Sequence, residues 1–157
     1  MIHNILIADA NRSLLAFHES VLQEAGYAVA TAHDMNAVST QLRRATFSLV
    51  IAELAFPEAG PDGALSLIRR VAAVRPGTPI LVLTSNTDLA LHRKARGMGV
   101  WDVSVKPTLY TELLSLTRNI LESAYPERTG LVHFTEHLGT RPVVSSAIAL
   151  RGSRPLP

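Results

Sequence analysis

The sequence predicts an α/β protein with a doubly wound parallel sheet, and two observations lead to that prediction. Five short apolar stretches alternate with five amphipathic helical segments within the first 123 residues. The apolar stretches contain few polar residues, which is typical of strands that helices cover on both faces. Crossovers between parallel strands are right-handed, so few topologies fit this order.

Hydrophobic spacing predicts the first five elements. Apolar residues recur at intervals of three and four over residues 12–25, which favours a helix, and Gly26 follows where that helix would end. Asp34 is suited to cap the next helix, because a carboxylate accepts hydrogen bonds from free amide groups there. In order, the elements are a strand over residues 4–8, the helix over 12–25, a strand over 27–31, the helix after Asp34 and a strand over 47–53.

The alternation continues after a loop at residues 57–62 that is rich in Pro and Gly. Pro76 and Gly77 interrupt the chain before the fourth strand, and Gly97 or Gly99 ends the helix after it. In order, these elements are a helix over residues 63–74, a strand over 79–84, a helix over 87–96, a strand over 100–105 and a helix over 108–123.

Residues 1–123 are therefore predicted to form one domain, and residues 124–157 a C-terminal tail that is extended or partly disordered. Within the tail, residues 142–150 are apolar enough to form a strand or a docking arm. The net charge of +2 belongs to the tail, because 11 cations and 11 anions balance up to Ser123. A weakly basic tail argues against nucleic acid as a partner, since nucleic-acid sites are clustered basic patches.

Composition excludes several kinds of protein. The chain has no cysteine, which excludes a disulfide framework, a thiolate zinc site and a cysteine nucleophile. No apolar run approaches the roughly 20 residues that span a bilayer. The first residues contain no basic segment ahead of an apolar one, so we expect no secretory signal and a cytoplasmic protein.

Four polar side chains follow the expected strands at their carboxyl ends: Asp9, Glu53, Thr84 and Lys106. One such residue is unremarkable in itself, because strand ends meet water. Four of these types from four strands favour a site, since open parallel sheets carry their function at this edge.

These positions resemble the receiver domain of two-component response regulators, the family of the chemotaxis regulator. The motifs that carry the resemblance are residues 5–9, residues 49–54 with Pro57, residues 81–85, and Gly99 through Lys106 and Pro107. The resemblance implies a flavodoxin-like sheet of five parallel strands in the order 2-1-3-4-5, with five helices and a C-terminal extension. It also implies a role in phosphorelay signal transduction.

In that family an aspartate at the end of the third strand accepts a phosphoryl group from a histidine kinase. Two acids after the first strand hold magnesium, and a threonine and a lysine bind the phosphoryl oxygens. The resemblance assigns these last two roles to Thr84 and Lys106, and makes Pro107 a candidate for a cis-proline. Asp9 matches the first of the two metal-binding acids.

The sequence departs from the family at critical positions. Glu53 replaces the acceptor aspartate, Ala10 replaces the second acid, and Val103 stands where the family often has a switching Tyr or Phe. A glutamate is one methylene longer, and a misplaced nucleophile lowers the rate of transfer steeply. We therefore expect no cofactor and no metal, with Mg²⁺ bound weakly at best and only through Asp9 and Glu53.

The predicted function is that of an atypical, stand-alone receiver domain that acts through phosphorylation-independent protein–protein interaction rather than catalysis. Its partner would be a histidine kinase or a downstream effector, with no membrane contact, and the surfaces also suit a homodimer. Glu53 either mimics an activated state or fills an inert pocket by satisfying Lys106. Trp101 is either a partner anchor or a packing residue against the fourth helix.

Two alternatives follow from the same residues. The first is a receiver that a histidine kinase still phosphorylates. The second, from another class, is a small nucleotide- or flavin-binding enzyme on this fold. That enzyme would need a phosphate cradle, whereas the turn after the first strand contains residues 9–12, Asp-Ala-Asn-Arg, and no glycine.

Overall fold

The computed structural model describes residues 2–54, 63–106 and 108–128, in which strands and helices alternate as the sequence predicts. The strands are β1 (Asn4–Ala8), β2 (Ala28–Ala32), β3 (Leu49–Ala52), β4 (Ile80–Thr84) and β5 (Asp102–Val105). The helices are α1 (Arg12–Glu24), α2 (Met35–Arg44), α3 (Ser66–Val74), α4 (Leu89–Gly97) and α5 (Tyr110–Ala124). Short 3₁₀ turns, η2 (Gly63–Leu65) and η3 (Pro126–Arg128), precede α3 and follow α5.

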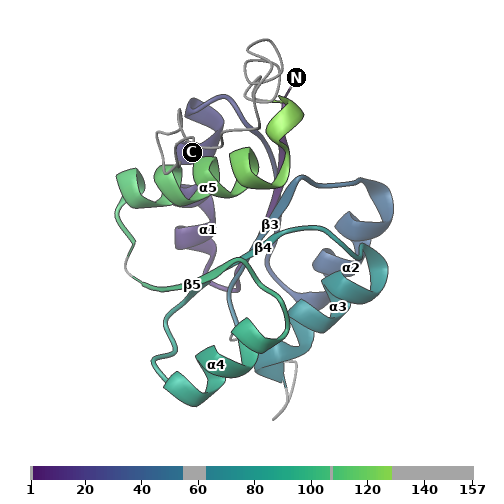
Figure 1. Cartoon of the computed structure of the whole chain (residues 1–157), viewed down its shortest axis with the longest axis vertical. Coiled ribbons are helices and arrows are strands. Elements are labelled where there is room, and N and C mark those ends of the chain that lie inside the picture. The colour runs from purple at the N-terminus through teal and green to yellow at the C-terminus, as the bar shows by residue number, and fades with distance from the viewer. Residues whose placement is uncertain (1, 55–62, 107, 129–157) are drawn as a thin grey trace, which may run out of the picture. The chain divides into compact units, whose positions relative to one another are not determined.

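The strands form one parallel sheet in the order β2-β1-β3-β4-β5, which confirms the expected topology (Figure 1). Strand β1 is hydrogen-bonded on both sides, with Leu6 opposite Ala30 in β2 and Val50 in β3. The order reverses at β1 and β3, so their carboxyl ends mark the edge where such sheets place their sites.

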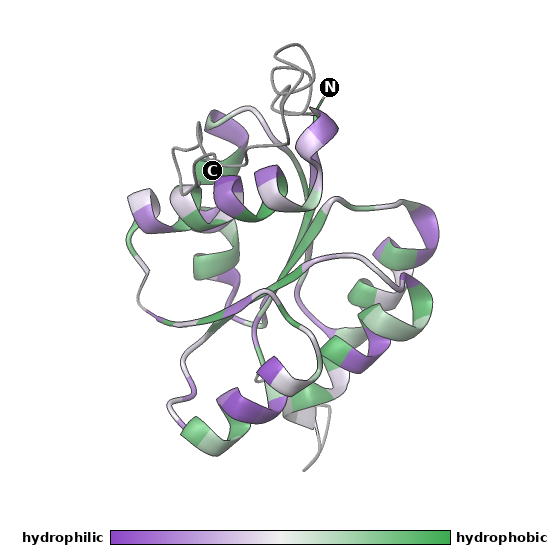
Figure 2. Cartoon of the chain, viewed as in Figure 1, coloured by the Kyte–Doolittle hydropathy of each residue, from purple (hydrophilic) through white to green (hydrophobic). Residues whose placement is uncertain are grey.

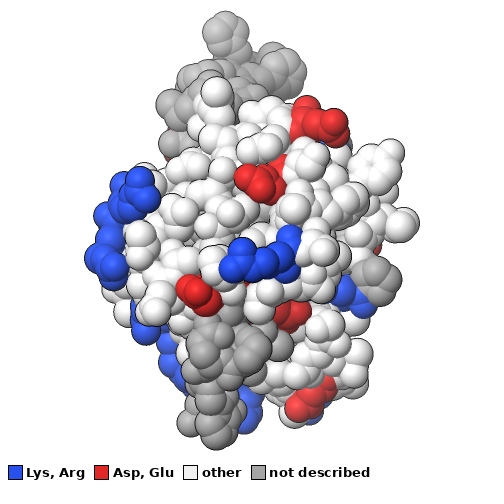
Figure 3. Space-filling view, turned by 180° about the vertical axis from the view of Figure 1, so that it is seen from behind, with Lys and Arg blue, Asp and Glu red and all other residues white. Residues whose placement is uncertain are grey.

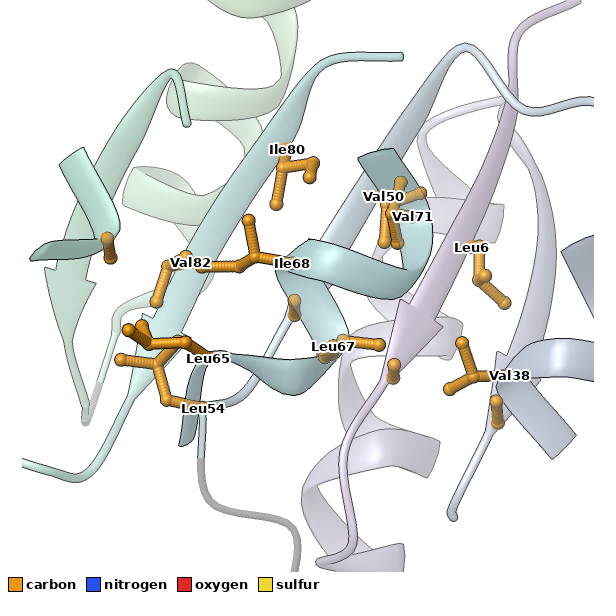
Figure 4. Close-up of a cluster of buried hydrophobic side chains, with 14 of the residues drawn as sticks. Leu6, Val38, Val50, Leu54, Leu65, Leu67, Ile68, Val71, Ile80 and Val82 are labelled. Carbon is orange, nitrogen blue, oxygen red and sulfur yellow. The ribbon is translucent and has the colours of Figure 1, made fainter. Parts of the chain in front are cut away.

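Alternating strand side chains divide the core into two layers. On one face, apolar residues of the sheet pack with buried residues of α2, α3 and α4, including Val38, Ile68 and Ala95 (Figure 4). On the other face lies α1, which buries Leu15, His18 and Leu22 (Figure 1). Strands β3 and β4 are hydrophobic along their length, whereas the helices have one polar side (Figure 2). This pattern explains why the central strands contain so few polar residues.

Three side chains fix where helices begin. Asn11, Asp34 and Asp88 precede α1, α2 and α4, and each accepts a hydrogen bond from an amide of the first turn. The predicted cap at Asp34 is therefore confirmed, whereas the helix expected from residue 87 begins later because Asp88 is its cap. Gly99, with φ of 92°, provides the left-handed residue after α4, a role that the sequence left open between Gly97 and Gly99.

Residues 2–115 group as one compact unit, and the chain from Leu116 onward belongs to a second unit. The predicted domain boundary after Ser123 stays a prediction. The loop at 57–62, Pro107 and the apolar segment 142–150 lie outside the described residues. In the described ranges, no helix has the length and apolar character needed to cross a bilayer.

Candidate functional site

The register of the central strands brings Asp9 and Glu53 together. Ala8 and Ala52 are partners in the β1–β3 ladder, so the residues that follow them leave the sheet side by side. The ladder extends one step further, since the Glu53 amide donates to the Ala8 carbonyl at 2.9 Å. Both acids are buried, with 4% and 5% of their surface exposed. Two adjacent buried carboxylates need a positive partner or strong donors.

Lys106 provides the positive charge. It follows β5, and its amide donates to the Thr84 carbonyl at 2.8 Å, which continues the β4–β5 ladder. Its ammonium group donates to Asp9 Oδ2 and to Glu53 Oε2, the latter at 3.1 Å. One cation thus joins both carboxylates. The sequence predicted the contact with Glu53 but not the contact with Asp9.

The other carboxylate oxygens also accept hydrogen bonds. The Asn11 amide donates to Asp9 Oδ1 at 2.8 Å, and the Leu54 amide donates to Glu53 Oε1 at 2.6 Å. Ser85 donates to Glu53 Oε2 through its amide at 3.1 Å and through its hydroxyl at 3.3 Å. All four carboxylate oxygens are therefore engaged by donors within the protein. Ser85 was missed as a site residue, although it directly follows the Thr84 that the sequence singled out.

Thr84 is fully buried beside Glu53. Its Oγ1 accepts from the Asn86 amide at 3.0 Å, and its side chain also hydrogen-bonds Glu53. Burial raises the pKa of Glu53, but the hydrogen bonds from Thr84 and Ser85 and the charge of Lys106 outweigh it, so the pKa lies below its ordinary value of 4.5. Glu53 is therefore a carboxylate anion at neutral pH.

The residues around Asp9 and Glu53 do not form a binding site for the magnesium ion that the family resemblance implies. Ala10 has no ligating atom, and the four oxygens of Asp9 and Glu53 already accept from amides, Ser85 and Lys106. Magnesium requires near-octahedral oxygen coordination. Asn11 does not replace the lost ligand, because its Oδ1 caps α1 through the Leu14 amide at 3.1 Å. Over the described ranges, no group of three His, Asp or Glu side chains is arranged to hold a metal ion.

His18 is a buried histidine on the α1 face of the sheet, with 3% of its surface exposed. Burial lowers its pKa, the charge of Lys106 lowers it further, and the charge of Asp9 partly opposes both effects. The imidazole is therefore neutral near pH 7. The sequence signal was its position within the apolar stripe of α1, between Leu15 and Leu22.

The loop between β4 and α4 is tied to both its neighbours. At one end the loop donates to Glu53 through Ser85 and to the Thr84 hydroxyl through the Asn86 amide. At the other end, Nε2 of the buried His92 lies 2.6 Å from the Asn86 carbonyl oxygen. A carbonyl only accepts, so this nitrogen must carry the hydrogen. A continuous set of hydrogen bonds thus runs from Glu53 to the first turns of α4.

Val103 in β5 and Trp101 just before it differ in solvent exposure. Val103, at the position where the family often has Tyr or Phe, is 8% exposed and belongs to the apolar core. Trp101 is 47% exposed. A valine cannot swing between a buried and an exposed position as a large ring could, so β5 has no such switch at this position.

A comparison with protein families matches residues 5–118 to the response regulator receiver domain. Among curated relatives, the transcriptional regulatory protein TctD of Salmonella typhimurium is 29% identical over 135 residues, covering 86% of this chain and 57% of that protein. The DNA-binding transcriptional regulator NtrC of Rhizobium meliloti is 27% identical, covering 79% of this chain and 25% of that protein. The chain therefore spans between a quarter and rather more than half of these relatives.

Solved structures agree on the fold. A CheY-like receiver domain protein from Methanospirillum hungatei JF-1 aligns with a TM-score of 0.74 at 20% identity, covering 81% of this chain and 99% of that one. The chemotaxis response regulator CheY4 of Vibrio cholerae aligns with a TM-score of 0.68 at 24% identity, covering 76% and 99%. The flavodoxin-like, chemotaxis-regulator fold is thereby confirmed.

Proposed function

Because the chain belongs to the response regulator receiver domain family, we propose that it is an atypical receiver that signals by phosphorylation-independent contact with a protein partner. The observation that carries the proposal is the Lys106 ammonium group, which joins Asp9 and Glu53. This contact fills the pocket with protein groups, at the place where the family resemblance implies a phosphoryl group and a metal ion.

The chemistry of Glu53 supports the same proposal. A carboxylate must present a free oxygen to attack a phosphoryl group, and both oxygens of Glu53 accept hydrogen bonds from protein donors. Its extra methylene also displaces these oxygens relative to an aspartate. The loss of an acid at Ala10 removes charge that would hold a neutralising cation. We propose that the domain acts by binding and not by catalysis.

Glu53 either mimics the activated state or is an inert filler. In both cases its carboxylate keeps the same hydrogen bonds to Lys106, Ser85 and Leu54. The two cases differ in how far the pocket influences α4. If Glu53 mimics activation, Glu53→Gln moves the amide resonances of residues 86–92 as well as those of Thr84 and Ser85. If Glu53 is inert, only its direct neighbours move.

The proposed partner is a protein, either a histidine kinase or a downstream effector, and the proposed location is the cytoplasm. The relatives named as regulators of transcription are longer proteins, so their action on DNA is not part of this proposal. A homodimer is compatible with it.

Intact-mass spectrometry after incubation with acetyl phosphate and Mg²⁺ tests the proposal. We expect no phosphoryl adduct on the wild-type chain. The double variant Ala10→Asp/Glu53→Asp restores the family's acids and serves as the positive control, which should acquire the adduct. A wild-type adduct that disappears in Glu53→Gln would establish the alternative, a receiver that still accepts phosphate.

A further inference from the structure

Helices α2 and α3 and the residue that ends α3 carry five arginines, which we call the arginine face: Arg43, Arg44, Arg69, Arg70 and Arg75. The first four are exposed, and Arg75 is half-buried at the C-terminal end of α3. In Figure 3, which views the molecule from behind, blue side chains follow the left edge, where α2 and α3 lie. The two helices are in contact, and Arg70 and Arg75 reach across to α2 and the residue that follows it, so the arginines belong to neighbouring elements.

No carboxylate accompanies these arginines on their own elements. Residues 35–52 and 63–79 contain neither Asp nor Glu. Across the described ranges, the ion pairs involve His33, Arg96 and Lys106, and none involves the arginine face. Five of the 11 cations up to Ser123 therefore belong to stretches of the sequence that contain no anion.

Contacts within the protein use only some of the hydrogen-bond donors of these arginines. Arg70 donates to the Ser39 hydroxyl across the α2–α3 contact, and Arg75 donates to the Ala45 carbonyl at 3.4 Å. Arg43 and Arg44 lie in the last turn of α2, where positive charge is favourable. Each guanidinium has five N–H donors in a planar fork, so most donors on this face stay available to a partner.

The side chains of this surface favour a partner that carries carboxylates. Planar guanidinium forks bind carboxylates in a bidentate manner. Val74 is 37% exposed among them, which adds a small apolar contact. Neither α2 nor α3 exposes an aromatic ring on which a nucleic-acid base could stack. The chain's own tail does not fit, because from Ala124 onward it has four cations and two anions.

We propose that the arginine face binds an acidic segment, rich in Asp and Glu, of a partner protein. The surface is distinct from the pocket of Asp9, Glu53 and Lys106, and binding there needs no phosphoryl group. The inference therefore stands or fails independently of the proposed function.

Fluorescence anisotropy with a labelled Glu-rich peptide of about ten residues tests this inference on the full chain. The test variant is Arg43→Gln/Arg44→Gln/Arg69→Gln, which leaves the two arginines that join the helices. The control is Arg12→Gln/Arg93→Gln/Lys94→Gln, which removes three exposed charges elsewhere. Thermal unfolding verifies that both variants fold.

We expect the test variant to weaken peptide binding roughly tenfold, because exposed pairs each contribute a modest amount, and the control to change it by less than about twofold. Four results would overturn the proposal: no binding of the peptide to wild type, equal weakening by both variants, tighter binding of duplex DNA than of the peptide, or dissociation of a homodimer specifically in the test variant. The last two would assign the surface to nucleic acid or to a second copy of the chain.

Discussion

Lys106 is the most informative residue to change, because one ammonium group serves two buried carboxylates. The side chain of Lys106 is 9% exposed, and those of Asp9 and Glu53 are 6% and 5% exposed. Lys106→Met keeps much of the aliphatic stem and leaves both carboxylates without their cation. Removing one partner of a buried ion pair costs about 3–5 kcal/mol. At about 2–4 °C per kcal/mol for a chain of this size, the melting temperature should fall by roughly 6–20 °C.

Urea unfolding followed by circular dichroism at neutral pH measures this loss. Lys94→Met changes an exposed lysine of α4 and should alter the free energy of unfolding by no more than about 0.5 kcal/mol. The triple variant Asp9→Asn/Glu53→Gln/Lys106→Met removes the cation together with both anions, so it should regain much of the lost stability. A Lys106→Met protein within about 1 kcal/mol of wild type would refute the argument, as would a triple variant less stable than the single one.

Four further variants test the residues around Glu53, the β4–α4 loop and the end of α4. The pKa of His18 is lowered, so stability should decline as the pH falls below its unfolded value of 6.5, and His18→Leu should remove this decline. The pKa of Glu53 is also lowered, so its contribution to the free energy of unfolding is present above pH 4.5 and is lost on further acidification. Glu53→Gln should remove this loss of stability at acidic pH. Unfolding measured over a pH series tests both residues, and a profile that His18→Leu or Glu53→Gln leaves unchanged would contradict the role given to that residue. His92→Phe removes the donor to the β4–α4 loop and should cost about 1–3 kcal/mol, with faster hydrogen exchange in residues 85–88; unchanged exchange would mean that the bond does not hold the loop. Gly99→Ala, at φ of 92°, should cost roughly 1 kcal/mol in thermal unfolding, whereas Gly97→Ala in α4 should cost nothing, and equal effects would exclude a conformational cause.

Much of the fold follows from the sequence, because hydrophobic period and capping residues are local signals. The alternation of strands and helices and the cap at Asp34 could both be predicted from them. The strand order came from the family resemblance, since local spacing does not say which strands are neighbours. The ends of some elements differ from those predicted, because capping side chains lie outside the hydrophobic pattern. Helix α4, for example, begins after residue 87 because Asp88 is its cap.

The site was predictable as a set of strand ends but not as a network. Asp9, Glu53, Thr84 and Lys106 do converge, because the carboxyl ends of parallel strands share one edge. The contact of Lys106 with Asp9 depends on the reach of a long side chain between two strands that are not neighbours. His18 joins the site only through the packing of α1 onto the sheet, which no spacing within one segment reveals.

Because Lys106 already joins Asp9 and Glu53, we propose that this acidic site responds neither to a phosphoryl group nor to magnesium. Amide NMR spectra of the full chain with Mg²⁺ and beryllofluoride, a phosphoryl mimic, test this most directly, with Ala10→Asp/Glu53→Asp as the responsive control. We expect the wild-type amides of Thr84, Ser85 and Lys106 to keep their positions while those of the control move. Saturable shifts of these three amides in the wild-type protein would contradict it.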